Sequence, residues 1–157
     1  MTTRFLLLAA TVALGTAASA AQGPAWGTLP EALALARAEG RPALVYVHAP
    51  WCGPCRRLER ETFPAVASRL GAFARAELTI DDRDRTHRVG PYRLSEAEWA
   101  ARLGAETTPT LVLLDADGAV LGRHTGFLPP DGLRAVLDAA LAAAPEAADP
   151  SALPPDR

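Results

Sequence analysis

The two cysteines of this 157-residue chain, Cys52 and Cys55, lie in the stretch APWCGPCRR with only Gly53 and Pro54 between them. Two thiols at this spacing can form a reversible disulfide, supply half of a metal site or close a structural disulfide. A bridge across two residues closes so small a loop that it removes little entropy from the unfolded chain. It would therefore be a poor structural staple, and the spacing favours a redox pair that opens and closes.

Metal binding is the alternative to redox chemistry. A tetrahedral zinc site needs four ligands, whereas the chain has two cysteines and three histidines, with no histidine at zinc-finger spacing from the pair. His48, four residues before Cys52, leaves a Cys–Cys–His copper site open. Attachment of c-type haem requires a histidine directly after the second cysteine, and that residue is Arg56.

The elements around the cysteines should activate Cys52. Residues 43–48, ALVYVH, form a short apolar run that predicts a buried strand, and a helix should follow the cysteines until Pro64 breaks it. At the N-terminus of a helix, unpaired N–H groups and the positive end of the dipole stabilise a thiolate, and cysteines in such motifs have pKa values of about 3.5 to 7.5. Cys52 is thus the expected attacking sulfur, and the more shielded Cys55 the resolving one.

The rest of the pattern predicts a single α/β domain with a mixed sheet. Thr28 and Ser95 each open a capping box, and Asp117-Gly118 is a hairpin turn between two apolar runs. We expect helices at 29–39, 95–103 and 131–144, strands at 75–80, 110–114 and 119–124, and a long polar surface loop at 81–93.

Charge and the N-terminus restrict the partners and the compartment. The 16 basic residues, all arginine, are interspersed with 18 acidic ones, so nucleic-acid binding is not expected. Arg4, an apolar run that is too short to span a membrane, and Ala18-Ser19-Ala20 predict a cleaved signal peptide over residues 1–20. Residues 21–144 would form the mature domain in an oxidising compartment, and the proline-rich residues 145–157 a disordered tail.

The motif WCGPC, at residues 51–55, resembles the active site of the thioredoxins, and TTPT, at 107–110, resembles their cis-proline loop. The likeness covers roughly residues 26–142. The stretches CRRLERETF and TGF (125–127) are most similar to exported relatives, in particular the periplasmic C-terminal domain of the transmembrane thiol:disulfide interchange reductase. The resemblance implies a thioredoxin fold, with a mixed central β-sheet flanked by helices on both faces, and a periplasmic location.

The resemblance also implies the site. Cys52 would be the nucleophile and Cys55 the resolving cysteine, with no bound cofactor or metal. Backbone beside a cis bond at residue 109 would pair with an extended substrate. The substrate-binding residues that it implies are Trp51, which would flank an exposed sulfur, Gly53, Pro54, Thr108 and Pro109.

One residue departs from the family pattern. Thioredoxins usually have a buried aspartate in the strand before the motif, which accepts the proton of the resolving cysteine, and here that residue is Tyr46. Glu59, at i+4 from Cys55 and i+7 from Cys52, is expected on their helical face and is the candidate proton acceptor. The alternative for Glu59 is a solvated surface charge.

These observations predict an exported, monomeric thiol:disulfide oxidoreductase that reduces protein disulfides. The resemblance implies that a membrane electron donor of the transmembrane reductase type recharges its dithiol. A disulfide oxidase or isomerase acting on dithiol substrates is one rival, because a threonine before the proline, as at Thr108 here, also occurs in some exported relatives. The other is a non-enzymatic copper chaperone that uses Cys52, Cys55 and His48.

Overall fold

The computed structural model describes residues 25–144. The predicted signal peptide at 1–20 and the predicted tail at 145–157 lie outside these residues. No helix within 25–144 is both long enough and apolar enough to cross a membrane.

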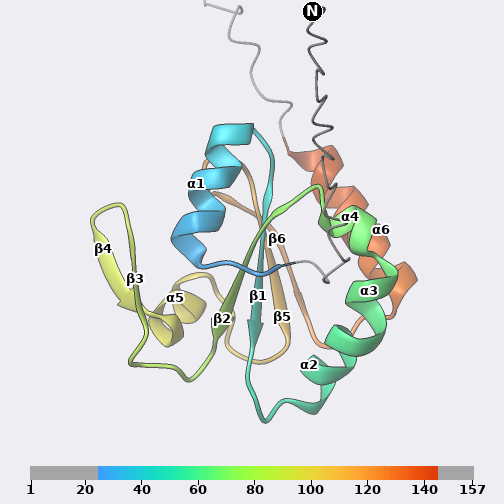
Figure 1. Ribbon diagram of the computed structural model, residues 1–157, viewed down its shortest axis with the longest axis horizontal. Coiled ribbons are helices and arrows are strands. Elements are labelled where there is room, and N and C mark those ends of the chain that lie inside the picture. The colour runs from blue at the N-terminus through green and yellow to red at the C-terminus, as the bar shows by residue number, and fades with distance from the viewer. Residues whose placement is uncertain (1–24, 145–157) are drawn as a thin grey trace, which may run out of the picture.

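A four-stranded mixed sheet forms the centre of the fold (Figure 1). Its strand order is β2-β1-β5-β6, in which β1 pairs parallel with β2 and antiparallel with β5, and β5 pairs antiparallel with β6. The strands are β1 (Ala43–His48), β2 (Ala74–Thr79), β5 (Thr110–Leu114) and β6 (Val120–Thr125). The mixed sheet confirms the predicted architecture, and the predicted bounds of β1 and β5 are correct.

Helices cover both faces of the sheet, as expected (Figure 1). Alternate residues of β1 serve the two sides: Leu44 and Tyr46 belong to one hydrophobic cluster, Val45 and Val47 to the other. On the Val45 side lie α1 (Leu29–Glu39) and α5 (Glu96–Arg102). On the Tyr46 side lie α2 (Gly53–Arg57), the π-helical turn η1 (Leu58–Thr62), α3 (Phe63–Ala65), α4 (Ala67–Leu70) and α6 (Pro130–Ala143).

Both predicted capping boxes are present. The Thr28 hydroxyl accepts from the N–H of Glu31, whose carboxylate accepts from the N–H of Thr28, and Ser95 and Glu98 make the same exchange at the start of α5. Gly40 ends α1 in the left-handed conformation, at φ 60°.

The predicted long loop at 81–93 is wrong, because it contains most of a β-hairpin. Strands β3 (Thr86–Val89) and β4 (Tyr92–Ser95) pair antiparallel as a separate two-stranded sheet. His87 is buried while Arg88 beside it is exposed, and Gly90 turns the chain at φ 56°. The charged flanks conceal this short alternation in the sequence.

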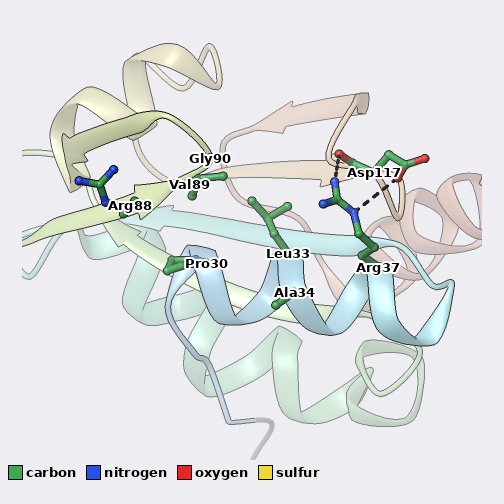
Figure 2. Close-up of a pocket in the computed structure, with 8 residues that line it drawn as sticks. All are labelled: Pro30, Leu33, Ala34, Arg37, Arg88, Val89, Gly90 and Asp117. Carbon is green, nitrogen blue, oxygen red and sulfur yellow. Dashed lines mark hydrogen bonds and ion pairs between the residues drawn. The ribbon is translucent and has the colours of Figure 1, made fainter.

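The hairpin lies beside α1, with a surface hollow between them (Figure 2). The hollow is bordered by an exposed ion pair, in which Arg37 Nε lies 3.6 Å from Asp117 Oδ1. None of the residues that line it is among those predicted for the site, so it is not part of the candidate active site.

The predicted break of the second helix at Pro64 is also wrong. The chain widens into the π turn η1, in which Phe63 N–H bonds to Leu58 C=O, and Pro64 then occupies the first turn of α3. The π turn changes the hydrogen-bond pattern just before Pro64, so the helical path continues through this residue although proline has no N–H to donate. The chain departs from helical geometry only at Val66, at φ −118° and ψ 18°.

Candidate active site

The cysteine motif lies where β1 leads into α2. The N–H of Cys52 bonds to the carbonyl of Ala49 at 3.0 Å, which closes a tight turn after the strand. Cys52 then serves as the N-cap of α2, and its Sγ accepts the N–H of Cys55 at 3.1 Å. A sulfur in this position satisfies an otherwise unpaired helical donor, and the same contact stabilises a thiolate.

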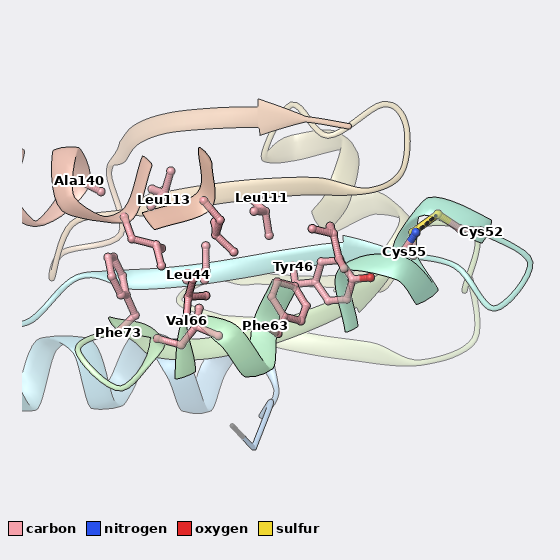
Figure 3. Close-up of a cluster of buried hydrophobic side chains, with 14 of the residues drawn as sticks. Leu44, Tyr46, Cys52, Cys55, Phe63, Val66, Phe73, Leu111, Leu113 and Ala140 are labelled. Atoms are coloured by element: carbon pink, nitrogen blue, oxygen red, sulfur yellow. Dashed lines mark hydrogen bonds between the residues drawn. A yellow bond between two sulfur atoms is a disulfide. The ribbon is translucent and has the colours of Figure 1, made fainter. Parts of the chain in front are cut away.

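Cys52 and Cys55 form a disulfide, with their Cα atoms 5.2 Å apart. It lies at one end of the hydrophobic cluster on the Tyr46 side (Figure 3). Cys52 is 3% exposed and Cys55 0%. The expected exposed sulfur at residue 52 is therefore wrong for the disulfide form, because Sγ is bonded to the fully buried Cys55 and directed to its N–H.

Trp51 is the large exposed side chain of the motif, at 66%. Its indole Nε1–H donates to Asp81 Oδ2 at 2.9 Å. Asp81 is not among the site residues predicted from the sequence, although its position in the chain could have indicated it. Asp81 follows β2, and since β2 runs parallel to β1, the residues after both strands meet at one edge of the sheet.

The proline loop lies at the same edge as the cysteines. The Thr108–Pro109 peptide bond is cis, and Thr110 pairs with Val47 in the antiparallel ladder. This register places the loop beside the end of β1, from which the motif continues. Gly126 N–H bonds to Pro109 C=O at 2.8 Å, whereas the N–H and C=O of Thr108 make no hydrogen bond to other residues of the described chain.

The segment at residues 126–129, here the 126–129 loop, is attached to the helix that carries the cysteines. The hydroxyl of Thr62 donates to the carbonyl of Leu128 at 2.7 Å. The guanidinium carbon of Arg57 lies 4.1 Å from the centre of the Phe127 ring, a cation–π contact. An aromatic surface therefore borders the motif beside the proline loop.

Glu59 is exposed, yet its carboxylate is held. Its Oε1 accepts a hydrogen bond from the buried Tyr46 hydroxyl at 3.0 Å. Burial above all, and then the charge and hydrogen bond of Glu59, raise the pKa of Tyr46 above its ordinary value. Glu59 is therefore exposed, as the alternative of a solvated surface charge expects. Its hydrogen bond to Tyr46 nevertheless anchors it to the hydrophobic cluster that contains the cysteines.

His48, the third candidate copper ligand, makes other contacts. Its ring stacks on Tyr46 with centroids 4.9 Å apart, and its Nε2 lies 3.8 Å from Glu77 Oε2. Across residues 25–144, no three His, Cys, Asp or Glu side chains gather closely enough to hold a metal ion. The structure therefore gives the copper-chaperone alternative no support.

A disulfide at a helix N-terminus, at the same edge of the sheet as the cis-proline loop, is suited to exchange with another disulfide. Residues 29–141 match the family described as "Thioredoxin-like domain". The chain is 30% identical over 97 residues to the thiol:disulfide interchange protein DsbD of Cronobacter sakazakii. This match covers 60% of the chain but only 16% of that relative.

Solved structures agree with this assignment. A thioredoxin from Thermus thermophilus is 30% identical with a TM-score of 0.60, and the match covers 74% of this chain and 86% of that one. The DsbH oxidoreductase, at 19% identity and a TM-score of 0.57, shares the fold over 85% of this chain and 95% of its own. The chain therefore belongs to the thioredoxin-like family, and its enzyme class is that of the thiol:disulfide oxidoreductases.

Proposed function

We propose that this protein is exported to the periplasm and reduces disulfides of other proteins there with the Cys52/Cys55 dithiol. The observation that carries the proposal is the position of Cys52 as the N-cap of α2, with its Sγ 3.1 Å from the N–H of Cys55. The resemblance of the stretches CRRLERETF and TGF to the periplasmic reductase domain supports the reducing direction and the compartment. The similarity to the thiol:disulfide interchange protein DsbD supports the exchange chemistry. The predicted signal peptide at 1–20 supports export.

The reaction proceeds by two thiol–disulfide exchanges. The Cys52 thiolate attacks one sulfur of a substrate disulfide, forms a mixed disulfide and releases the other substrate sulfur as a thiolate. Cys55 then loses its proton to Glu59 and attacks Cys52 Sγ, which releases the second substrate thiolate and closes the Cys52–Cys55 disulfide. Two electrons pass from the protein to its substrate, and the substrate thiolates take up protons according to their own pKa values.

Substrate would bind across the edge that joins the motif to the proline loop. The N–H and C=O of Thr108, which make no hydrogen bond within residues 25–144, can pair with an extended substrate backbone beside the cis bond to Pro109. Trp51, Gly53 and Pro54 are exposed residues of the motif and would form the rest of the contact surface.

The oxidised protein must be recharged. A dithiol near the thioredoxin potential of about −270 mV lies some 150 mV below a strong exported oxidant at about −120 mV. At about 30 mV per 1.4 kcal/mol, the difference favours oxidation by roughly 7 kcal/mol. We propose as the electron donor a membrane protein with a dithiol, of the transmembrane reductase type that the sequence resemblance implies.

Trapping tests the function. With Cys55→Ser, tagged protein expressed in an exporting cell should accumulate mixed disulfides at Cys52 that a reductant releases, and mass spectrometry would identify the partners. Cys52→Ser is the matched control and should hold none. Absence of any covalent partner in the Cys55→Ser protein would contradict the proposal, and a reduction potential near −120 mV would favour the oxidase instead.

A further inference from the structure

The Tyr46 hydroxyl is the polar tip of a side chain that is otherwise enclosed. Tyr46 is 1% exposed and belongs to the same hydrophobic cluster as Cys52 and Cys55. In Figure 3 its ring points the hydroxyl toward the end of the cluster where Cys55 lies. The partner that the structure gives this hydroxyl is Glu59 Oε1, at 3.0 Å.

Three aromatic rings hold Tyr46 in this orientation. Trp26 lies 5.4 Å from it between ring centroids, Phe63 lies at 5.1 Å edge-on, and His48 stacks on it at 4.9 Å. Such contacts fix both the position and the tilt of a ring. The hydroxyl therefore occupies a set point in the fold, whereas an exposed glutamate on a helix would otherwise sample several rotamers.

The charges around Tyr46 favour its protonated form. Burial is the main cause of its raised pKa, followed by the nearby carboxylates of Glu59 and Glu77. His48 Nε2, on the stacked ring, lies 3.8 Å from Glu77 Oε2. Tyr46 thus remains a hydrogen-bond donor throughout the physiological pH range.

The bond leaves half of the Glu59 carboxylate free. Oε1 is engaged by Tyr46, while the structure shows no hydrogen bond or ion pair to Oε2 from residues 25–144. Cys55 and Glu59 are four residues apart on a continuous helical stretch, a spacing that places their side chains on one face. An anchored carboxylate with one open oxygen on that face is arranged to accept a proton.

We propose that Tyr46 is a positioning residue, which holds Glu59 on the Cys55 face of the helix so that Oε2 receives the Cys55 thiol proton during the second exchange. The inference rests on the proposed function and adds a residue to it. In the step, the S–H bond of Cys55 breaks, an O–H bond forms on Glu59, and the Cys55 thiolate displaces the bound partner sulfur from Cys52. Tyr46 retains its own proton throughout.

Reaction with the aromatic disulfide 5,5′-dithiobis(2-nitrobenzoate) separates the two exchanges. Reduced protein should release one coloured thiolate in a phase that depends on reagent concentration, when Cys52 attacks, and a second in a unimolecular phase, when Cys55 attacks. Glu59→Gln should slow the second phase by about 100-fold, a typical loss for general base catalysis. Tyr46→Phe, which keeps the ring, should slow it about 10-fold and leave the first phase unchanged.

The double variant and two controls test positioning. Tyr46→Phe combined with Glu59→Gln should be no slower than Glu59→Gln alone, because the hydroxyl acts only through the carboxylate. Tyr92→Phe and Glu61→Gln, both at exposed residues, should change either phase by less than about twofold. Added formate, a small base, should accelerate the second phase of Glu59→Gln but not that of the unmodified protein.

Each outcome decides between the proposals. Absence of both phases in the unmodified protein would contradict the proposed function itself. Three other outcomes would overturn the role of Tyr46 and leave the proposed function standing. They are a second phase of normal rate in Tyr46→Phe, equal slowing of both phases in Tyr46→Phe, and multiplicative slowing of the second phase in the double variant. An NMR measurement does not require the phenylalanine variant to fold: Glu59→Gln should shift the Tyr46 ring carbon that carries the hydroxyl, and an unshifted signal would also overturn it.

Discussion

Replacement of Glu96 by alanine should destabilise the domain strongly. Glu96 is 2% exposed at the start of α5, and its carboxylate joins three parts of the chain. Oε2 accepts the N–H of Thr79 at 2.7 Å, at the end of β2, and Oε1 lies 3.0 Å from Nε2 of the buried His87 in β3. Arg85 Nη1 approaches the same oxygen at 3.4 Å.

The magnitude follows from the groups that lose their partners. The partly buried N–H of Thr79 would be unsatisfied, at a cost of about 1–3 kcal/mol. The buried His87 would lose a hydrogen bond to a charged group, worth about 1.5–3 kcal/mol. Arg85 is largely exposed and adds little. The sum of roughly 2.5–6 kcal/mol brackets the usual cost of breaking a buried pair, about 3–5 kcal/mol, and its middle corresponds to a fall in Tm of about 15 °C.

Urea unfolding followed by tryptophan fluorescence, with the disulfide kept oxidised in every sample, measures this loss. Glu96→Gln should lose less than Glu96→Ala, since its amide oxygen can still accept the N–H of Thr79. Glu106→Gln, at an exposed residue, is the control and should stay within about 0.5 kcal/mol. A loss below about 1 kcal/mol in Glu96→Ala would refute the buried network, and with it the anchoring of the hairpin.

Three further predictions concern stability. Gly104→Ala should destabilise by about 2 kcal/mol in urea unfolding, because Gly104 has φ +72°, which strains a residue with a Cβ, and the Arg123 side chain would also have to move; an unchanged midpoint would contradict the left-handed backbone at this residue. Leu44→Ala, at a fully buried residue of β1, should cost about 2–5 kcal/mol, and a loss under 1 kcal/mol would show that the core is not packed as described. The N–H and hydroxyl of Ser95 lower the pKa of Glu98, so this carboxylate should add stability above its unfolded pKa and lose that contribution as the pH falls through its lower folded pKa. Unfolding midpoints of Glu98→Gln should therefore fall less between pH 7 and pH 3 than those of the unmodified protein, and equal falls would contradict the capping bond.

The regular elements were largely predictable because their signals are local. The bounds of α1 follow from a capping box at Thr28 and a left-handed Gly40, both of which act within one helical turn. β1 and β5 are continuous apolar runs, as expected of strands buried on both faces. The motif could be placed at the start of a helix because it directly follows the apolar run of β1.

The features that the sequence did not predict depend on contacts between residues that are not neighbours in the chain. In the hairpin of β3 and β4, His87 is buried against the carboxylate of Glu96, and no local sequence pattern predicts that pair. The bond between Tyr46 and Glu59 joins a strand to a helix thirteen residues later, across a distance that the fold alone sets. Asp81 meets Trp51 only because two parallel strands end at the same edge.

Under the proposed function, the attachment of the 126–129 loop to the cysteine helix would affect how a partner is selected. The Thr62–Leu128 bond and the contact of Arg57 with Phe127 tie the aromatic border to the scaffold that carries the sulfurs. Both sides of the docking surface would then be held by the same scaffold. A client protein would have to fit its own disulfide segment to this surface, so discrimination would depend on how readily each client can extend that segment.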